Sequence, residues 1–132
     1  MGNLLVIFAG GGLGALARFF LSRLVGSRID QALPFGTLFV NVTGSFLIGL
    51  VLSLVETAVL PALWRPLVAV GFIGAYTTFS TYAFETVSLL QKKAYGPAIW
   101  NFFLNNVLSM AAIVLGMLAA SILISALRGQ RP

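Results

Sequence analysis

Uncharged polar side chains gather in a few stretches of an otherwise apolar chain. The densest stretch, residues 71–82, carries two glycines and four aliphatic hydroxyl residues, which makes it a poor helix former. We expect a helix break here, because freed backbone carbonyls are tolerated at membrane depth when they are buried or line an ion site. Such carbonyls suit an alkali cation coordinated by oxygen. The alternative is a kinked helix whose hydroxyls bond back to their own backbone.

Neutral amides form a second candidate group. Asn101, Asn105 and Ser109 are spaced i, i+4, i+8, which places them in one stripe on a helix. Asn41 is a further amide among apolar residues. Neutral donors of this kind can replace the water shell of an anion step by step. The alternative is that they join neighbouring helices by hydrogen bonds.

Aromatic and charged side chains flank the polar stretches. The rings of Phe79 and Tyr82 have electropositive edges, which favour an anion over a cation. Arg18 lies within an apolar stretch, where it either faces a water-filled vestibule or extends to the membrane surface. Glu85, four residues after Thr81, is placed to orient hydroxyls or to pair with a basic residue.

Composition places these groups in a membrane. Of 132 residues, 59% are hydrophobic and 8% charged, against about 25% charged in soluble domains, and the mean hydropathy is +1.02. The chain has no Cys or His, and its acids are Asp30, Glu56 and Glu85, which disfavours an enzyme. The net charge of +5 is typical of anchors at lipid headgroups, so we expect no nucleic-acid partner.

The gaps between charges predict an all-α integral membrane protein with four transmembrane helices. A helix crosses the hydrocarbon in about 20 residues. The predicted spans are 4–25, 35–58, 67–91 and 98–126. Short connections predict one four-helix domain over residues 1–132, with the third helix broken in mid-membrane.

The basic residues show no bias that would fix one orientation. With the N-terminus inside, the inner side carries Arg65, Arg128 and Arg131. The outer side then carries Arg23, Arg28, Lys92 and Lys93, and Arg18 is left out because it lies within the first span. Because Lys/Arg asymmetry normally sets topology, this balance predicts an antiparallel, dual-topology homodimer. The alternative is that a single charge or the termini fix one orientation.

The same residues resemble the Fluc/CrcB family of bacterial fluoride channels, and the resemblance extends over essentially the whole chain. It rests on three motifs: Gly10-x-x-x-Gly14-x-x-x-Arg18, Gly36-Thr37-Leu38-x-x-Asn41-x-x-Gly44-Ser45 and Gly71-Phe72-x-Gly74-x-x-Thr77-Thr78-Phe79-Ser80-Thr81. The third motif is highly specific. The resemblance implies two fluoride pores along the interfaces of an antiparallel dimer. It also implies a central structural sodium ion (Na+), held by the Gly74 and Thr77 carbonyls of both subunits.

Pore residues follow from the same resemblance. Phe79 matches the first ring of the pore, and Tyr82 stands at the second, where Phe is commoner. The other matched positions are Asn41, Ser80, Thr81, Glu85, Arg18 and the track Asn101, Asn105 and Ser109.

We therefore expect a passive fluoride channel, spanning the inner membrane of a bacterial cell several times, that releases cytoplasmic fluoride. A small multidrug exporter is the first alternative, but it depends on a carboxylate deep in the first helix, and no acid precedes Asp30. A non-transporting membrane assembly subunit is the second alternative. It accounts for the glycines but not for the combination of broken helix, polar stripe and paired rings.

Overall fold

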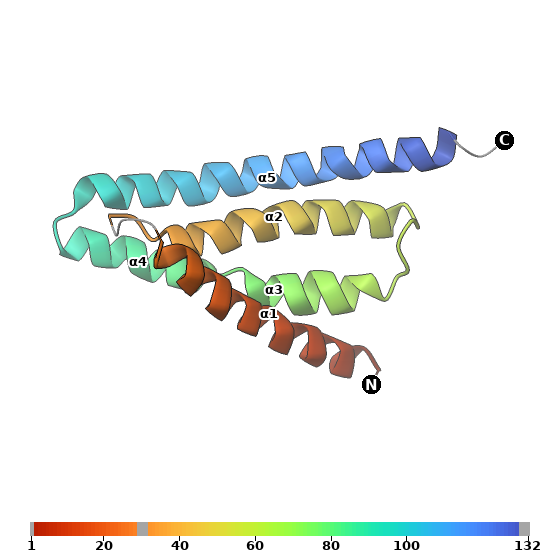
Figure 1. Ribbon diagram of the computed structural model, residues 1–132, viewed down its shortest axis with the longest axis horizontal. Helices are drawn as coiled ribbons and strands as arrows, with labels where there is room; N and C mark the ends of the chain where they lie inside the picture. The colour runs from red at the N-terminus through yellow and green to blue at the C-terminus, as the bar shows by residue number, and fades with distance from the viewer. Residues whose placement is uncertain (1, 29–31, 130–132) are drawn as a thin grey trace.

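The computed structural model describes residues 2–28 and 32–129 and consists of helices joined by short connections (Figure 1). Asp30 and Arg131, which entered the charge arguments above, lie outside the described residues. The elements are α1 (Gly2–Gly26), α2 (Phe35–Glu56), η1 (Arg65–Ile73), α3 (Gly74–Tyr76), α4 (Phe79–Gln91) and α5 (Tyr95–Gly129). No strand occurs among the described residues.

Four helical segments are long and apolar enough to cross a membrane. They are Gly2–Gly26, Phe35–Glu56, Arg65–Gln91 and Tyr95–Gly129, the third being η1, α3 and α4 in succession. Their ends lie within about three residues of the predicted spans, because charged residues and prolines mark them. The all-helical, four-span fold is thus confirmed. Most large apolar side chains are exposed, as expected of a surface that meets lipid.

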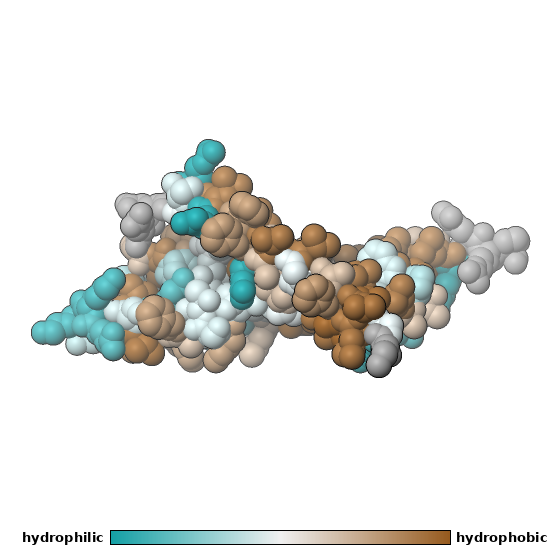
Figure 2. Space-filling view, turned by 90° about the horizontal axis from the view of Figure 1, so that it is seen from below, coloured by the Kyte–Doolittle hydropathy of each residue, from teal (hydrophilic) through white to brown (hydrophobic). Residues whose placement is uncertain are grey.

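The segments pack as two pairs. Helix α5 runs the length of the molecule beside α2, while η1 and α4 lie end to end with a break between them, and α1 crosses at an angle (Figure 1). Hydrophobic side chains cover much of one face, and hydrophilic ones gather mainly toward its left end (Figure 2).

Glycines let the backbones of paired helices touch. A Cβ at Gly10 would meet the Leu67 carbonyl oxygen, and one at Gly14 the Phe72 carbonyl oxygen. Gly49 and Gly116 make equally close approaches between α2 and α5. The G-x-x-x-G spacing of Gly10 and Gly14 is therefore a close-packing motif between α1 and η1.

The wide winding of η1 was not predicted. Its nine residues form a π-helix, which begins at Arg65 next to Pro66 and ends at Ile73, just before the polar stretch. Short π segments are frequent at functional sites. Here the π-helix leads directly into the helix break.

Candidate ion pathway

The third span is broken at Thr77 and Thr78. Thr77 (φ −87°, ψ 158°) and Thr78 (φ −150°, ψ 113°) are extended, and α4 starts immediately afterwards at Phe79. The break near the middle of Arg65–Gln91 is therefore confirmed, as the two glycines and the run of hydroxyls predicted.

Asn41 of α2 stabilises the extended backbone at the break. Its Oδ1 accepts a hydrogen bond from the Thr78 N–H (2.8 Å), and its Nδ2 donates to the Thr78 carbonyl (3.1 Å). One amide thus satisfies both backbone groups of a buried extended residue. This pairing replaces the helical hydrogen bonds that Thr78 would otherwise make.

The break deprives two carbonyls of their helical donors. In a continuous helix the Thr78 N–H would donate to the Gly74 carbonyl, and the Thr81 N–H to the Thr77 carbonyl. Here the first N–H donates to Asn41 and the second to the Thr78 hydroxyl (3.2 Å). Gly74 and Thr77 therefore present carbonyl oxygens with the oxygen chemistry that an alkali ion requires.

Thr78 also caps α4. Its Oγ1 accepts from the Thr81 N–H, as N-cap threonines do. The same hydroxyl donates to Thr81 Oγ1 (3.0 Å) and lies 3.3 Å from Ser80 Oγ. Ser80 and Thr81, both predicted as site residues, are thus tied to the start of α4 and remain exposed.

A ladder of amides extends from the break along α5. Asn41 Nδ2 donates to Asn105 Oδ1 (3.0 Å), Asn105 Nδ2 donates to Asn101 Oδ1 (2.9 Å), and Asn101 Nδ2 donates to Thr86 Oγ1 (2.8 Å). Asn101 and Asn105 are 2% and 5% exposed. The predicted stripe therefore faces the interior of the subunit, with Ser109 one turn further along and half-buried.

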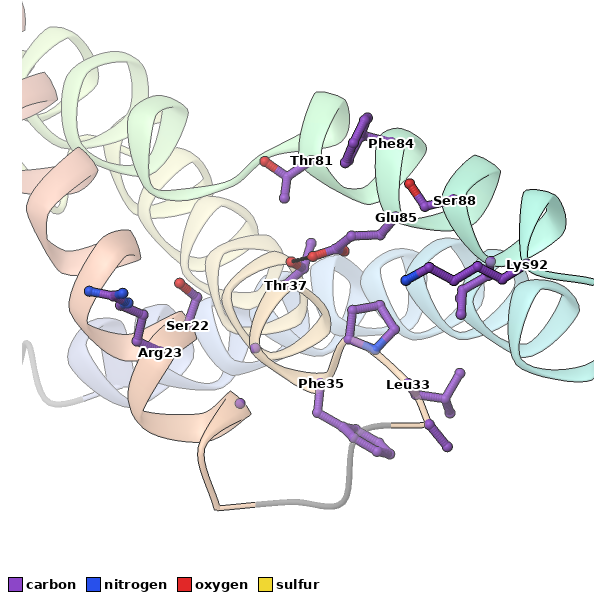
Figure 3. A pocket seen from close by; sticks show the side chains of 15 residues that line it. Ser22, Arg23, Leu33, Phe35, Thr37, Thr81, Phe84, Glu85, Ser88 and Lys92 are labelled. Carbon is purple, nitrogen blue, oxygen red and sulfur yellow. Dashed lines mark hydrogen bonds between the residues drawn. The ribbon is translucent and has the colours of Figure 1, made fainter. Parts of the chain in front are cut away.

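An outer cavity of about 520 Å³ lies between α1, the start of α2 and α4 (Figure 3). Arg23 and Lys92 line it together with Glu85. Glu85 Oε1 accepts a 2.7 Å hydrogen bond from the Thr37 hydroxyl, so the carboxylate orients a hydroxyl, one of the two roles foreseen for it. The other oxygen, Oε2, is buried and has no hydrogen-bond partner among the described residues.

A middle cavity of about 360 Å³ follows. Arg18 lines it beside Thr37, Thr78 and Thr81. The half-buried Arg18 thus borders a cavity that three threonines also line, consistent with the expected vestibule.

An inner cavity of about 300 Å³ lies at the break. Its lining residues include Asn41, Thr78, Phe79, Tyr82, Asn105 and Ser109. The Phe79 and Tyr82 rings lie edge to face, with centroids 5.3 Å apart and planes at 69°. Phe79 is 76% exposed, whereas Tyr82 is 5% exposed. The two predicted rings are therefore adjacent but differ in surroundings.

The three cavities adjoin one another through shared walls. Thr37 and Thr81 line both the outer and the middle cavity, and Thr78 lines both the middle and the inner one. The result is a sequence of adjoining cavities from one end of the subunit to the helix break. Basic groups lie in its outer part, and hydroxyls and amides in its inner part.

Three contributing residues were not predicted as site residues. Thr37 bonds Glu85, Thr86 ends the amide ladder, and Asn106 donates to the Tyr82 hydroxyl (2.9 Å). Thr37 lies within the second motif, which was the available signal. Asn106 directly follows a residue of the stripe and lies on a different face of the helix, so its spacing gave no signal.

Comparison with known proteins places this geometry in a family. The family described as "CrcB-like protein, Camphor Resistance (CrcB)" matches residues 5–117. A protein of Shewanella amazonensis named fluoride-specific ion channel FluC is 43% identical over 116 residues, 88% of this chain and 94% of that protein. A protein of the same name from Koribacter versatilis is 44% identical over 106 residues, 80% and 84% of the two chains. One from Aeromonas salmonicida is 43% identical over 114 residues, 86% and 91% of the two chains. The chain belongs to the CrcB family.

Proposed function

We propose that this chain forms a passive, fluoride-selective channel that lets fluoride leave the cytoplasm of a bacterial cell. Family membership and the names of the relatives support fluoride as the ion. The observation that carries the mechanism is the succession of adjoining cavities, whose inner walls carry uncharged hydroxyl and amide side chains among apolar ones. The protein is a multi-pass channel of the inner membrane rather than an enzyme.

Uncharged donors suit a small, strongly hydrated anion. Arg23, Lys92 and Arg18 raise the local concentration of anions in the outer and middle cavities. Further in, hydroxyls such as Thr81 and Ser109, which donate to no other group among the described residues, replace the water shell one partner at a time. A fixed charge would bind the ion too tightly for it to leave, whereas neutral donors release it. The exit path discharges fluoride that entered as HF and dissociated inside.

Exposed groups at the break support a second, inverted copy. Phe79 beside the inner cavity is 76% exposed, and Gly74 is exposed as well. The Gly74 and Thr77 carbonyls of the two copies would hold a sodium ion, which supplies positive charge that holds the broken spans together. Two pores would then follow the two interfaces of the dimer.

Fluoride efflux from liposomes tests the function. Vesicles containing the purified protein and loaded with potassium fluoride receive valinomycin, and an electrode records released fluoride. We expect rapid release, and no chloride release from vesicles loaded with potassium chloride. A folded dimer that releases no fluoride would contradict the proposal.

Cysteine labelling tests the dual topology, because the chain has no native cysteine. Arg28→Cys and Arg65→Cys place single thiols near opposite ends of the helices, at exposed positions. In intact spheroplasts a membrane-impermeant maleimide should label about half of each variant. Full labelling of one variant and none of the other would show a single orientation.

Exchange of sodium tests the ion. We expect the dimer in detergent to dissociate more readily when sodium is replaced by N-methylglucamine, as measured by sedimentation. A dimer equally stable in both salts would contradict the sodium site.

A further inference from the structure

Tyr82 lines the inner cavity, and its hydroxyl has one hydrogen-bond partner among the described residues. Tyr82 Oη is 2.9 Å from Nδ2 of Asn106, and both side chains line the cavity. A phenolic hydroxyl can accept hydrogen bonds and donate one. Which of these roles remains available to the cavity depends on how the Asn106 amide is turned.

The backbone fixes that amide. Asn106 Nδ2 also lies 2.7 Å from the Phe102 carbonyl oxygen. Because a carbonyl can only accept, the amide atom beside it must be the NH₂ group, and the reverse orientation would press two oxygens together. The NH₂ group therefore uses one hydrogen on Phe102 and the other on Tyr82 Oη.

Tyr82 is consequently an acceptor toward Asn106, and its own hydrogen is left over. Among the described residues the hydroxyl has no hydrogen-bond acceptor. A buried donor that makes no hydrogen bond costs about 1–3 kcal/mol, so an acceptor from the cavity is favoured. Asn41 and Phe79 line the same cavity.

Tyr76 shows the opposite arrangement. Its hydroxyl lies 2.9 Å from Thr43 Oγ1, and Thr43 donates its own hydrogen to the Phe39 carbonyl (2.7 Å). Tyr76 must therefore donate to Thr43, and its hydrogen is used within the subunit. Tyr76 is as buried as Tyr82 but lines none of the three cavities, which makes it a matched control.

We propose that the Tyr82 hydroxyl is a donor subsite for the permeating anion, held in the donating state by Asn106. The inference rests on the proposed function and specifies one of its binding groups. An O–H group donating to an anion makes a short, strong hydrogen bond. Tyr82 therefore contributes a hydroxyl donor as well as a ring edge, and Asn106 is a positioning residue that does not itself bind the ion.

Paired tyrosine variants test the subsite. In Tyr82→Phe the fluoride concentration that gives half-maximal efflux should rise about tenfold, since the strong donor is lost. In Tyr76→Phe it should change less than twofold. Ultraviolet difference spectroscopy of the purified dimer titrated with sodium fluoride provides a readout independent of flux. The phenol signal should be present in the wild type and Tyr76→Phe and lost in Tyr82→Phe.

A double-mutant cycle tests the positioning role. Asn106→Leu should weaken the fluoride-induced phenol signal and raise the half-maximal concentration, yet add nothing in a Tyr82→Phe background. A Tyr82→Phe channel with wild-type fluoride dependence and an intact difference signal would overturn the subsite while leaving the proposed function standing. A wild-type protein that conducts no fluoride would overturn the proposed function itself.

Discussion

Replacing Asn41 by Leu removes the side chain that holds the third span open. Leu has the same branched skeleton of side-chain heavy atoms but no polar atoms, so the variant loses three hydrogen bonds without opening a cavity. Two of these bonds satisfy the N–H and the carbonyl of Thr78, and the third reaches Asn105. Thr78 is 7% exposed, so water cannot readily replace the amide.

The expected loss in the free energy of unfolding follows from the number of polar groups left without a hydrogen-bond partner. A hydrogen bond inside a membrane protein contributes about 1 kcal/mol, and an unsatisfied buried group costs about 1–3 kcal/mol. Three lost bonds therefore predict a loss of about 3 kcal/mol in the free energy of unfolding. Fluoride efflux should fall at least tenfold, because the freed Thr78 N–H can return to the Gly74 carbonyl and close the break.

Thr43→Val is the matched control on the same helix. Thr43 bonds the Phe39 carbonyl and the Tyr76 hydroxyl and lines none of the three cavities. Loss of the Thr43 hydroxyl should lower the free energy of unfolding by about 1 kcal/mol and leave fluoride efflux unchanged. Unfolding in mixed micelles and liposome efflux would be measured on both variants. An Asn41→Leu protein as stable and as active as Thr43→Val would refute the role assigned to Asn41.

Three further predictions concern the ring, the helix packing and the dimer. Phe79→Ile should cut fluoride efflux while changing the free energy of unfolding of the separate subunit by less than about 0.5 kcal/mol, since the ring is exposed there. Wild-type efflux in this variant would remove Phe79 from the pore. Gly14→Ala should lower the free energy of unfolding by about 1–3 kcal/mol, because the new methyl group meets the Phe72 carbonyl. In the control Gly12→Ala, the new methyl group meets nothing within 4 Å, so the stability should not change. Equal stabilities of the two variants would contradict the close packing at Gly14. Gly74→Ala adds a methyl group whose nearest contact within the subunit is at an ordinary distance of 3.7 Å, so the subunit should fold normally. Dimerisation, measured by sedimentation, should weaken. An unchanged dimer would argue against Gly74 at the interface.

The spans and the break could be predicted because their signals are local. Charges and prolines delimit the helices, and the concentration of glycine and hydroxyl residues around Thr77 and Thr78 marks the break. The i, i+4, i+8 spacing likewise placed Asn101 and Asn105 on one face, and both are buried on it. Each inference needed only the periodicity of a helix.

The partners of these groups could not be predicted, since they come from distant parts of the chain. Asn41 meets Thr78 across 37 positions, and Thr37 meets Glu85 across 48. Those pairings depend on how the helices pack, which the glycine contacts determine in three dimensions. The π-helix Arg65–Ile73 was missed for a related reason, because its apolar sequence is compatible with ordinary helical winding.

The reversal potential of the current through a planar bilayer tests the central claim most directly. With a tenfold fluoride gradient and equal chloride on both sides, a passive fluoride-selective pathway should reverse near the fluoride equilibrium potential, about 59 mV in magnitude. Adding a pH gradient should not move that value, because the proposed path contains no proton-coupling step. A reversal potential near zero, or one that follows the pH gradient, would contradict passive conduction of fluoride along these donors.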